Sequence, residues 1–204
     1  MSPLETLGFA LGTSFASGLN IYATVAAAGL FQRFGLIQLP YNLEVLASPF
    51  VLGIAITLFL VEFIADKIPY VDSVWDTVHT FIRPPAAALI SYSAFGQVPE
   101  EWKVGAALLA GGVALTSHGA KATTRAAANT SPEPVSNWTL SFLEDGLAVF
   151  LAWMAAAHPI WTAVIVVVLV ILAVLLIWKL FGYLRVIRDR LTRRRTPARP
   201  STPI

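Results

Sequence analysis

The sequence predicts an all-α, polytopic membrane protein with about six transmembrane helices. Of its 204 residues, 56% are hydrophobic and 13% are charged, about half the charged share of a soluble domain. Apolar stretches of about 20 residues, the length that crosses a bilayer, recur along the chain. This composition excludes a soluble globular enzyme. The absence of cysteine excludes disulfide scaffolds and thiolate chemistry.

The first expected span runs from Leu4 to about Phe31 and is rich in small residues. Gly18 and Asn20 weaken the helix near its middle, which predicts a local unwinding that offers backbone carbonyls to a ligand. The alternative is a close helix crossing, which the GxxxG pair Gly8 and Gly12 also favours. Both interpretations stay open at this point.

Two further elements are expected in the first half of the chain. An apolar span runs from about Leu43 to Ile64, and a third segment runs from Tyr70 to Phe95. Pro84-Pro85 interrupts this segment, because proline breaks the helical hydrogen-bond ladder. We therefore expect an amphipathic helical stretch followed by a short apolar half. Its polar side either lies at the membrane interface or turns into the protein.

The second half of the chain is expected to supply three spans. Trp102 to about Asn129 is rich in small residues, and Asn137 to Ala157 is apolar except for Glu144-Asp145. The last span, Pro159 to about Tyr183, has no polar side chain between residues 163 and 177. Such a segment is expected to face lipid on most sides.

A weak similarity at an offset of 101 residues, half the chain, predicts an internal repeat. Gly18 aligns with Gly119 and Asn20 with Lys121. Three spans in each half would reverse the direction of the second, giving inverted repeats over 4–97 and 102–184, as in many secondary transporters. The alternative is six unrelated helices. We expect residues 1–184 to form one transmembrane domain.

The charges are distributed unevenly. Before residue 179 there are six Lys/Arg and eleven Asp/Glu, a net charge of −5; from residue 179 onward there are eight Lys/Arg and one Asp, a net charge of +7. The positive-inside rule places the basic, proline-containing tail, 185–204, in the cytoplasm, where we expect it to be disordered. We expect the protein to lie in the inner membrane, and six crossings would put both termini in the cytoplasm. The tail is expected to bind anionic phospholipid and not nucleic acid.

Several polar groups fall within the membrane region and share helix faces. Glu62 and Asp66 are four residues apart on one helix face, so they either bind a cation or carry a proton, or they form an interfacial helix end that is solvated or paired with Lys67. Two further groups of polar residues, spaced three or four apart, each form a stripe along one helix face. The first stripe is mostly acidic and the second mostly basic, and they either pair with each other or line a cavity. Their residues are Asp72, Asp76, His79 and Arg83 in the first, and His118, Lys121, Arg125 and Asn129 in the second.

The adjacent acids Glu144 and Asp145 lie mid-span, where a charge costs about 2.5–3.5 kcal/mol. Each is expected either to be proton-coupled or to pair with Lys121 or Arg125. No metal-ligand spacing and no cofactor motif is present. The candidate residues for binding a substrate or ion are Asn20, Glu62, Asp66, Asp72, Asp76, His118, Lys121, Arg125, Glu144 and Asp145.

We therefore expect a transporter of a small solute or ion, with a polar site between the two halves. The alternative is a non-transporting accessory membrane protein that binds lipid or a partner protein. An enzyme is not expected, because the sequence has no nucleophile elbow, P-loop or HExxH motif. A homo-oligomer is compatible with either function.

Several runs resemble the small multi-pass bacterial membrane proteins of domain-of-unknown-function family 4126. They are VEFIADKIPYVDSVWDTVHTFIRP at 61–84, SGLNIY at 17–22, SHGAKATTR at 117–125 and PEPVSN at 132–137. The resemblance covers about Leu4 to Tyr183 and implies an integral membrane protein without an assigned activity. A looser similarity links the chain to transporters with two three-helix repeats, although their Glu-x-Gly-Asp pattern is absent here.

Overall fold

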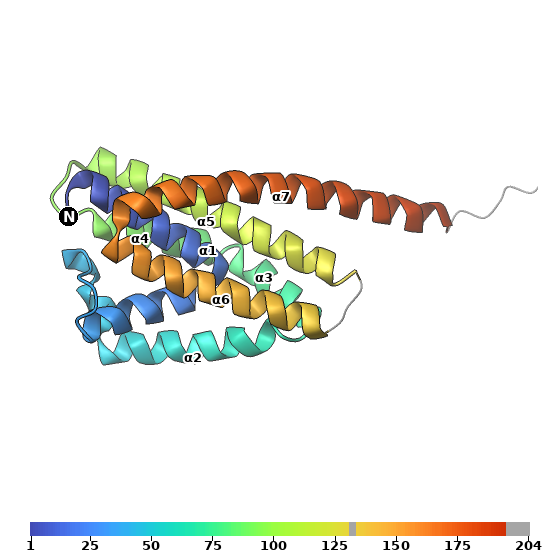
Figure 1. Ribbon diagram of the computed structural model, residues 1–204, viewed down its shortest axis with the longest axis horizontal. Coiled ribbons are helices and arrows are strands. Elements are labelled where there is room, and N and C mark those ends of the chain that lie inside the picture. The colour runs from blue at the N-terminus through green and yellow to red at the C-terminus, as the bar shows by residue number, and fades with distance from the viewer. Residues whose placement is uncertain (131–133, 195–204) are drawn as a thin grey trace, which may run out of the picture.

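The computed structural model of the chain describes residues 1–130 and 134–194, and these residues form helices joined by short loops (Figure 1). Of the tail predicted at 185–204 and expected to be disordered, residues 185–194 instead continue helix α7, and residues 195–204 lie outside the described residues. The all-α prediction is confirmed. The elements are α1 (Pro3–Arg33), η1 (Tyr41–Ala47), α2 (Pro49–Ala65), α3 (Val71–His79), α4 (Arg83–Ala94), α5 (Glu100–Ala128), α6 (Pro134–Ala157) and α7 (Pro159–Arg194).

Helix α1 folds back on itself at Asn20. The backbone of Asn20 leaves the helical region, with φ −154° and ψ 104°, so α1 consists of two helical legs. Phe9 in the first leg and Ala28 in the second belong to the same buried cluster. Gly29 lies against Leu46, which follows the second leg. The predicted unwinding is therefore present, and it makes α1 a hairpin whose apex lies inside the bundle (Figure 1).

This hairpin corrects the prediction that the first element is a simple crossing. A cavity near the N-terminus is lined by Thr6 together with Pro40 and Asn42, so both ends of α1 lie at one end of the molecule. Figure 1 shows α7 leaving the bundle at the opposite end. The N-terminal end and the described end of α7 therefore lie at opposite ends of the bundle, an arrangement that differs from the one expected for six crossings. The physical reason is the break at Asn20, which a count of apolar residues does not reveal.

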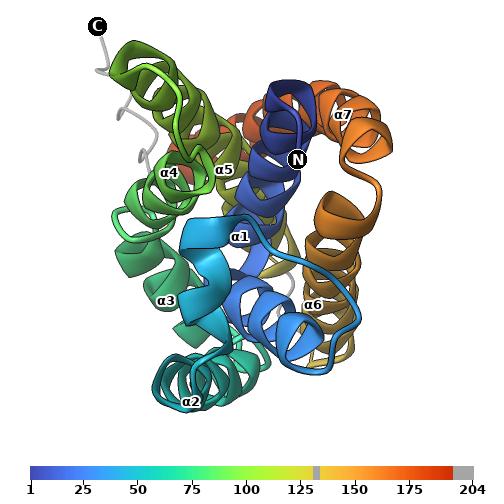
Figure 2. The ribbon, with the colours of Figure 1, turned by 90° about the vertical axis from the view of Figure 1, so that its left-hand side faces the viewer.

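The small residues of α1 also make the close crossings that the sequence offered as the alternative. A side chain at Gly8 would collide with the backbone of Pro159, and one at Gly12 with Ala155 and Thr162. Both interpretations of the small-residue pattern therefore hold, at different positions along the same helix. The view along the bundle in Figure 2 shows α1 surrounded by α4, α5, α6 and α7.

The second expected span is shorter than predicted. Residues 41–47 form the 3₁₀ helix η1, and α2 begins only at Pro49. The Ser48 side chain accepts a hydrogen bond from the Val51 amide and caps the helix, with proline in the first turn, a favourable start. Helix α2 therefore has 17 residues.

The broken third segment consists of α3 and α4, as predicted, with the break at residues 80–82. Proline lies in the first turn of α4, where its missing N–H is not needed. Helix α3 buries Asp72, Asp76 and His79 and exposes Val74 and Val78. Its polar side therefore turns into the protein and its apolar side faces outward, which decides between the two alternatives.

Among the described residues, three helices are long and apolar enough to cross a membrane: Pro3–Arg33, Val135–Ala157 and Pro159–Tyr183. Helix α2 is a shorter apolar helix, and α5 is long but carries polar residues that it buries. Along α7, Val167, Ile171 and Leu175 are exposed, whereas Val166 and Ala173 pack against the bundle. This pattern is that of a membrane protein whose last helix faces lipid on most sides.

Candidate functional site

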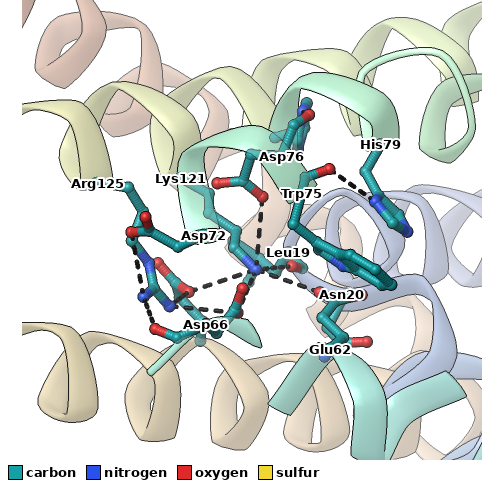
Figure 3. A network of polar contacts seen from close by, with 12 residues as sticks. Leu19, Asn20, Glu62, Asp66, Asp72, Trp75, Asp76, His79, Lys121 and Arg125 are labelled. Carbon is teal, nitrogen blue, oxygen red and sulfur yellow. Dashed lines mark hydrogen bonds and ion pairs between the residues drawn. The ribbon is translucent and has the colours of Figure 1, made fainter. Parts of the chain in front are cut away.

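The two predicted polar stripes face each other inside the bundle (Figure 3). Helices α2, α3, α4, α5 and α6 each contribute charged side chains to one buried group, which we call the charge cluster. Every member is at most 9% exposed. The members are Glu62, Asp66, Asp72, Asp76, Arg83, Lys121, Arg125, Glu144 and Asp145.

Lys121 lies at the centre of the charge cluster. Its Nζ donates to Asp66 Oδ2 at 2.7 Å and to Glu62 Oε1 at 3.2 Å. It also donates to the Leu19 carbonyl at 3.2 Å, beside the break in α1. The carboxylates of Asp76 and Glu144 lie at 3.8 and 3.6 Å. The ammonium group therefore occupies a cage of oxygens supplied by five separate residues.

Arg125, one turn further along α5, joins α2 to α6. Its Nη2 donates to Glu144 Oε2 at 2.6 Å and to Asp66 Oδ2 at 3.3 Å. Its Nη1 donates to the Asp66 carbonyl at 2.5 Å. Glu144 is therefore a partner of Arg125, one of the two roles that the sequence left open for it.

Arg83 joins the start of α4 to α2 and α1. Its Nη2 donates to Glu62 Oε1 at 2.6 Å, and its Nη1 donates to the Gly18 carbonyl at 2.8 Å. The same Nη1 lies 2.8 Å from Nδ1 of His118. The break in α1 was expected to offer carbonyls to a ligand. Two of these carbonyls, of Gly18 and Leu19, instead accept from the protein's own cations.

Asp145 contacts the apex of the α1 hairpin. Its Oδ1 accepts from Asn20 Nδ2 at 2.8 Å, while Asn20 Oδ1 accepts from the Ala23 amide at 2.9 Å. Asn20 thus caps the second leg of α1 and holds a carboxylate of α6 at the same time. At the other side of the charge cluster, Asp72 accepts from Asn129 Nδ2 at 2.9 and 3.1 Å.

The charge cluster contains six carboxylates and three cationic side chains. Five of its carboxylate oxygens are buried without a hydrogen-bond partner among residues 1–130 and 134–194: both oxygens of Asp76, Glu62 Oε2, Asp66 Oδ1 and Asp145 Oδ2. Buried charges are costly unless they are paired, so an excess of three formal negative charges calls for bound protons or a bound cation. This imbalance is the main chemical property of the site.

In residues 1–130 and 134–194, no group of three or more His, Asp or Glu side chains has a geometry that could hold a metal ion. The unpartnered oxygens are distributed along the cluster among the three cations.

All ten candidate residues of the sequence lie together in or beside the charge cluster. Arg83 belonged to the acidic stripe but was not among the candidates, although it is fully buried and pairs with Glu62 at 2.6 Å. The sequence pattern that could have identified Arg83 as a site residue was its spacing of seven residues from Asp76. Asn137, which donates to Asn129 at 3.2 Å, gave no such signal, because nothing in its local sequence sets it apart.

Lys67 does not pair with Glu62 or Asp66, the alternative that treated them as a solvated helix end. Its Nζ donates to the Phe63 carbonyl at 3.0 Å and to Ser141 Oγ at 3.2 Å, and it lies over the ring of Phe63. Glu62 and Asp66 are fully buried and turn toward α5 instead. The solvated alternative is therefore wrong.

The fold and the charge cluster together define a class: an all-helical membrane protein with a buried, predominantly acidic polar network. The family model described as a domain of unknown function (DUF4126) matches residues 7–179, and the chain belongs to this family, as the sequence resemblance implied. No curated protein and no solved structure matches the chain.

Proposed function

We propose that the protein transports an ion or small solute across the membrane and that the charge cluster binds the proton or small cation involved. The observation that supports this most directly is the excess of acid. Six carboxylates share three cations in a site buried inside the protein, and both oxygens of Asp76 lack a hydrogen bond to any described residue. Ionisable residues at such depth are costly and are typical of proton relays and ion pathways.

The broken helices support the same proposal. Transporters commonly place their sites where transmembrane helices are interrupted, because irregular backbone is tolerated there only beside a polar interior. Here α1 is interrupted at Asn20 and the third segment at residues 80–82, and both breaks adjoin the charge cluster. The predicted inverted repeat belongs to this proposal. The second leg of α1, α2 and α3–α4 run in directions opposite to α5, α6 and α7 respectively (Figure 1).

In this proposal Asp76 and Asp145 carry the exchangeable charge. Asp76 lies 3.5 Å from Arg83 Nη2 and 3.8 Å from Lys121 Nζ without a hydrogen bond to either. Loss or gain of a proton at Asp76 changes its electrostatic attraction to both Arg83 and Lys121. Since these cations hold the carbonyls of Gly18 and Leu19, a change of charge is transmitted to the hairpin apex of α1.

The second candidate function is an accessory protein without transport, in which the charge cluster only holds the helices together. One observation favours it: each of Arg83, Lys121 and Arg125 already has a carboxylate partner at 2.7 Å or less. In that case the basic tail would carry the function, by binding anionic phospholipid or a partner protein. Neither candidate is an enzyme.

We propose the inner membrane as the location, with the end of α7 in the cytoplasm. Lys179, Arg185 and the arginines that follow supply the positive charge that sets this orientation. Because α1 folds back, the N-terminal end of the described structure then lies on the opposite side. The charge cluster lies toward the cytoplasmic end of the bundle.

The test is flux in proteoliposomes that contain a pH-sensitive dye, with small cations and anions supplied in turn. We expect the wild-type protein to carry flux, and Asp76→Asn and Asp145→Asn to abolish it while the thermal unfolding of each variant stays cooperative. Glu44→Gln, at an exposed position in η1, is the matched control and is expected to retain flux.

The two candidate functions predict different outcomes. If the wild-type protein and both variants give equal flux, the flux does not depend on the charge cluster and the transport proposal fails. If truncation after Arg185 abolishes the cellular function while Asp76→Asn preserves it, the accessory function is favoured.

A further inference from the structure

A second candidate site lies at the end of the bundle opposite to the charge cluster. A half-enclosed cavity of about 870 Å³ opens between the first leg of α1, the loop before α5 and the first turns of α5. Its size lies within the range of small-molecule sites, about 300–1,000 Å³. None of its lining residues belongs to the charge cluster.

The cavity is apolar along its length. Leu4 and Leu7 line it from α1, Phe95 and Val98 from the loop, and Leu109 from α5. Gly105, also in the lining, has nothing within 4 Å of the position a Cβ would take, so its face of α5 is open. An apolar space of this kind is filled most favourably by hydrocarbon.

One end of the cavity carries a negative charge. Glu101 lines it in the first turn of α5, where a carboxylate is favourably placed near the helix N-terminus. Within the described part of the chain, no hydrogen bond or ion pair engages the side-chain carboxylate of Glu101, whereas the neighbouring Glu100 is paired. The neighbouring Lys103 does not neutralise it, because its Nζ donates to Glu100 at 2.8 Å. The indole of Trp102, which also lines the cavity, offers an aromatic face to a cation.

The order of these residues along α5 matches the orientation of a lipid in a bilayer. Glu101 and Trp102 begin the helix at the end of the molecule, and Leu109 follows about 12 Å deeper along the helix axis. A second cavity of about 330 Å³ adjoins at Pro3, Phe95 and Val98 and adds polar groups at this outer end. The charged end therefore lies outermost, where headgroups lie, and the apolar end lies deeper.

We propose that this cavity binds an amphiphile from the bilayer that has a cationic ammonium headgroup and a single alkyl chain. The headgroup lies between the Glu101 carboxylate and the Trp102 ring, and the chain extends past Gly105 toward Leu109. This site does not depend on the transport proposed for the charge cluster. An anionic amphiphile is excluded by repulsion from Glu101.

The test uses the full chain in nanodiscs and the fluorescence of Trp102. The probe is dodecyltrimethylammonium with bromine on its chain, since bromine quenches tryptophan, and the comparison probe carries the same chain on an uncharged glucoside. We expect saturable quenching by the cation that Trp102→Phe removes. Glu101→Gln is expected to weaken binding of the cation about tenfold, the loss of roughly one charged contact, and to leave the glucoside unchanged.

A cavity-filling variant completes the test. Gly105→Leu places a side chain in open space and is expected to abolish binding without loss of stability. Gly53→Leu in α2 is its matched control, because Gly53 also has nothing within 4 Å and lies outside the cavity. Equal binding by Gly105→Leu and the wild-type protein would overturn the site. Equal affinity for the glucoside and the cation would overturn the proposed ligand class.

Discussion

Arg125 shows how a single buried charge is held in this protein. Its guanidinium group contacts a carboxylate of α2, a carboxylate of α6 and the carbonyl that ends α2. At a fully buried position the free energy of such a group depends on its partners, because water is not there to replace them. Removal of one member therefore leaves the others uncompensated.

We expect Arg125→Met to lower the free energy of unfolding by about 3–5 kcal/mol, because Asp66 and Glu144 lose their shared partner. The measurement is denaturant unfolding in detergent micelles. Adding Glu144→Leu to Arg125→Met is expected to restore part of the loss, since it removes one unpaired charge.

Lys103→Met is the control for this prediction, because its pair with Glu100 lies at the surface, where Glu100 is 66% exposed. Its unfolding is expected to match that of the wild-type protein. Wild-type stability in Arg125→Met would show that the charge cluster does not hold the helices together.

At the scale of elements, α1 depends on small residues wherever another helix crosses it. A Cβ at Gly18 would collide with the side chain of Ser117 and the backbone of Ala114 in α5. This crossing places the Gly18 carbonyl beside Arg83. The hairpin apex is therefore positioned by packing as well as by hydrogen bonds.

Gly18→Ala is expected to destabilise the protein by about 1–3 kcal/mol, because α1 and α5 must move apart. Gly112→Ala in α5 is the matched control, since its added methyl group meets nothing within 4 Å. Helix propensity alone would make both substitutions favourable by up to about 1 kcal/mol. Thermal unfolding of the two variants separates these effects, and an equal gain in both would contradict the close crossing.

At the scale of the whole molecule, the hairpin in α1 decides which segments share an end of the bundle. Both ends of α1 lie at one end of the bundle, and α5 ends at the other (Figure 1). Ser2 and Phe34 flank α1, and Thr130 follows α5. A chain with six crossings would instead place Ser2 and Thr130 together and Phe34 opposite. The two topologies are thus experimentally distinct.

The chain has no cysteine, so single cysteines report on sidedness directly. We expect a membrane-impermeant maleimide to label Ser2→Cys and Phe34→Cys from the same side of oriented vesicles and Thr130→Cys from the other. Labelling of Ser2→Cys and Phe34→Cys from opposite sides would show that the first element crosses the membrane once and would contradict the hairpin.

Much of the secondary structure and of the candidate site followed from local patterns. Apolar length predicted α6 and α7, the proline pair predicted the break before α4, and the four-residue spacing of Lys121 and Arg125 predicted one polar stripe. The start of α2 was misplaced, because η1 is apolar as well and continues the pattern. Hydropathy measures composition and does not report where a cap such as Ser48 starts a helix.

The sequence by itself determined that this is a helical membrane protein of the family and which polar residues share a helix face, since composition and periodicity are local properties. Only the tertiary structure decided that α1 turns back at Asn20 and that its freed carbonyls hold Arg83 and Lys121. It also decided that six carboxylates share three cations. The physical reason is that pairing of buried charges is set by contacts between helices distant in sequence, which no local pattern encodes.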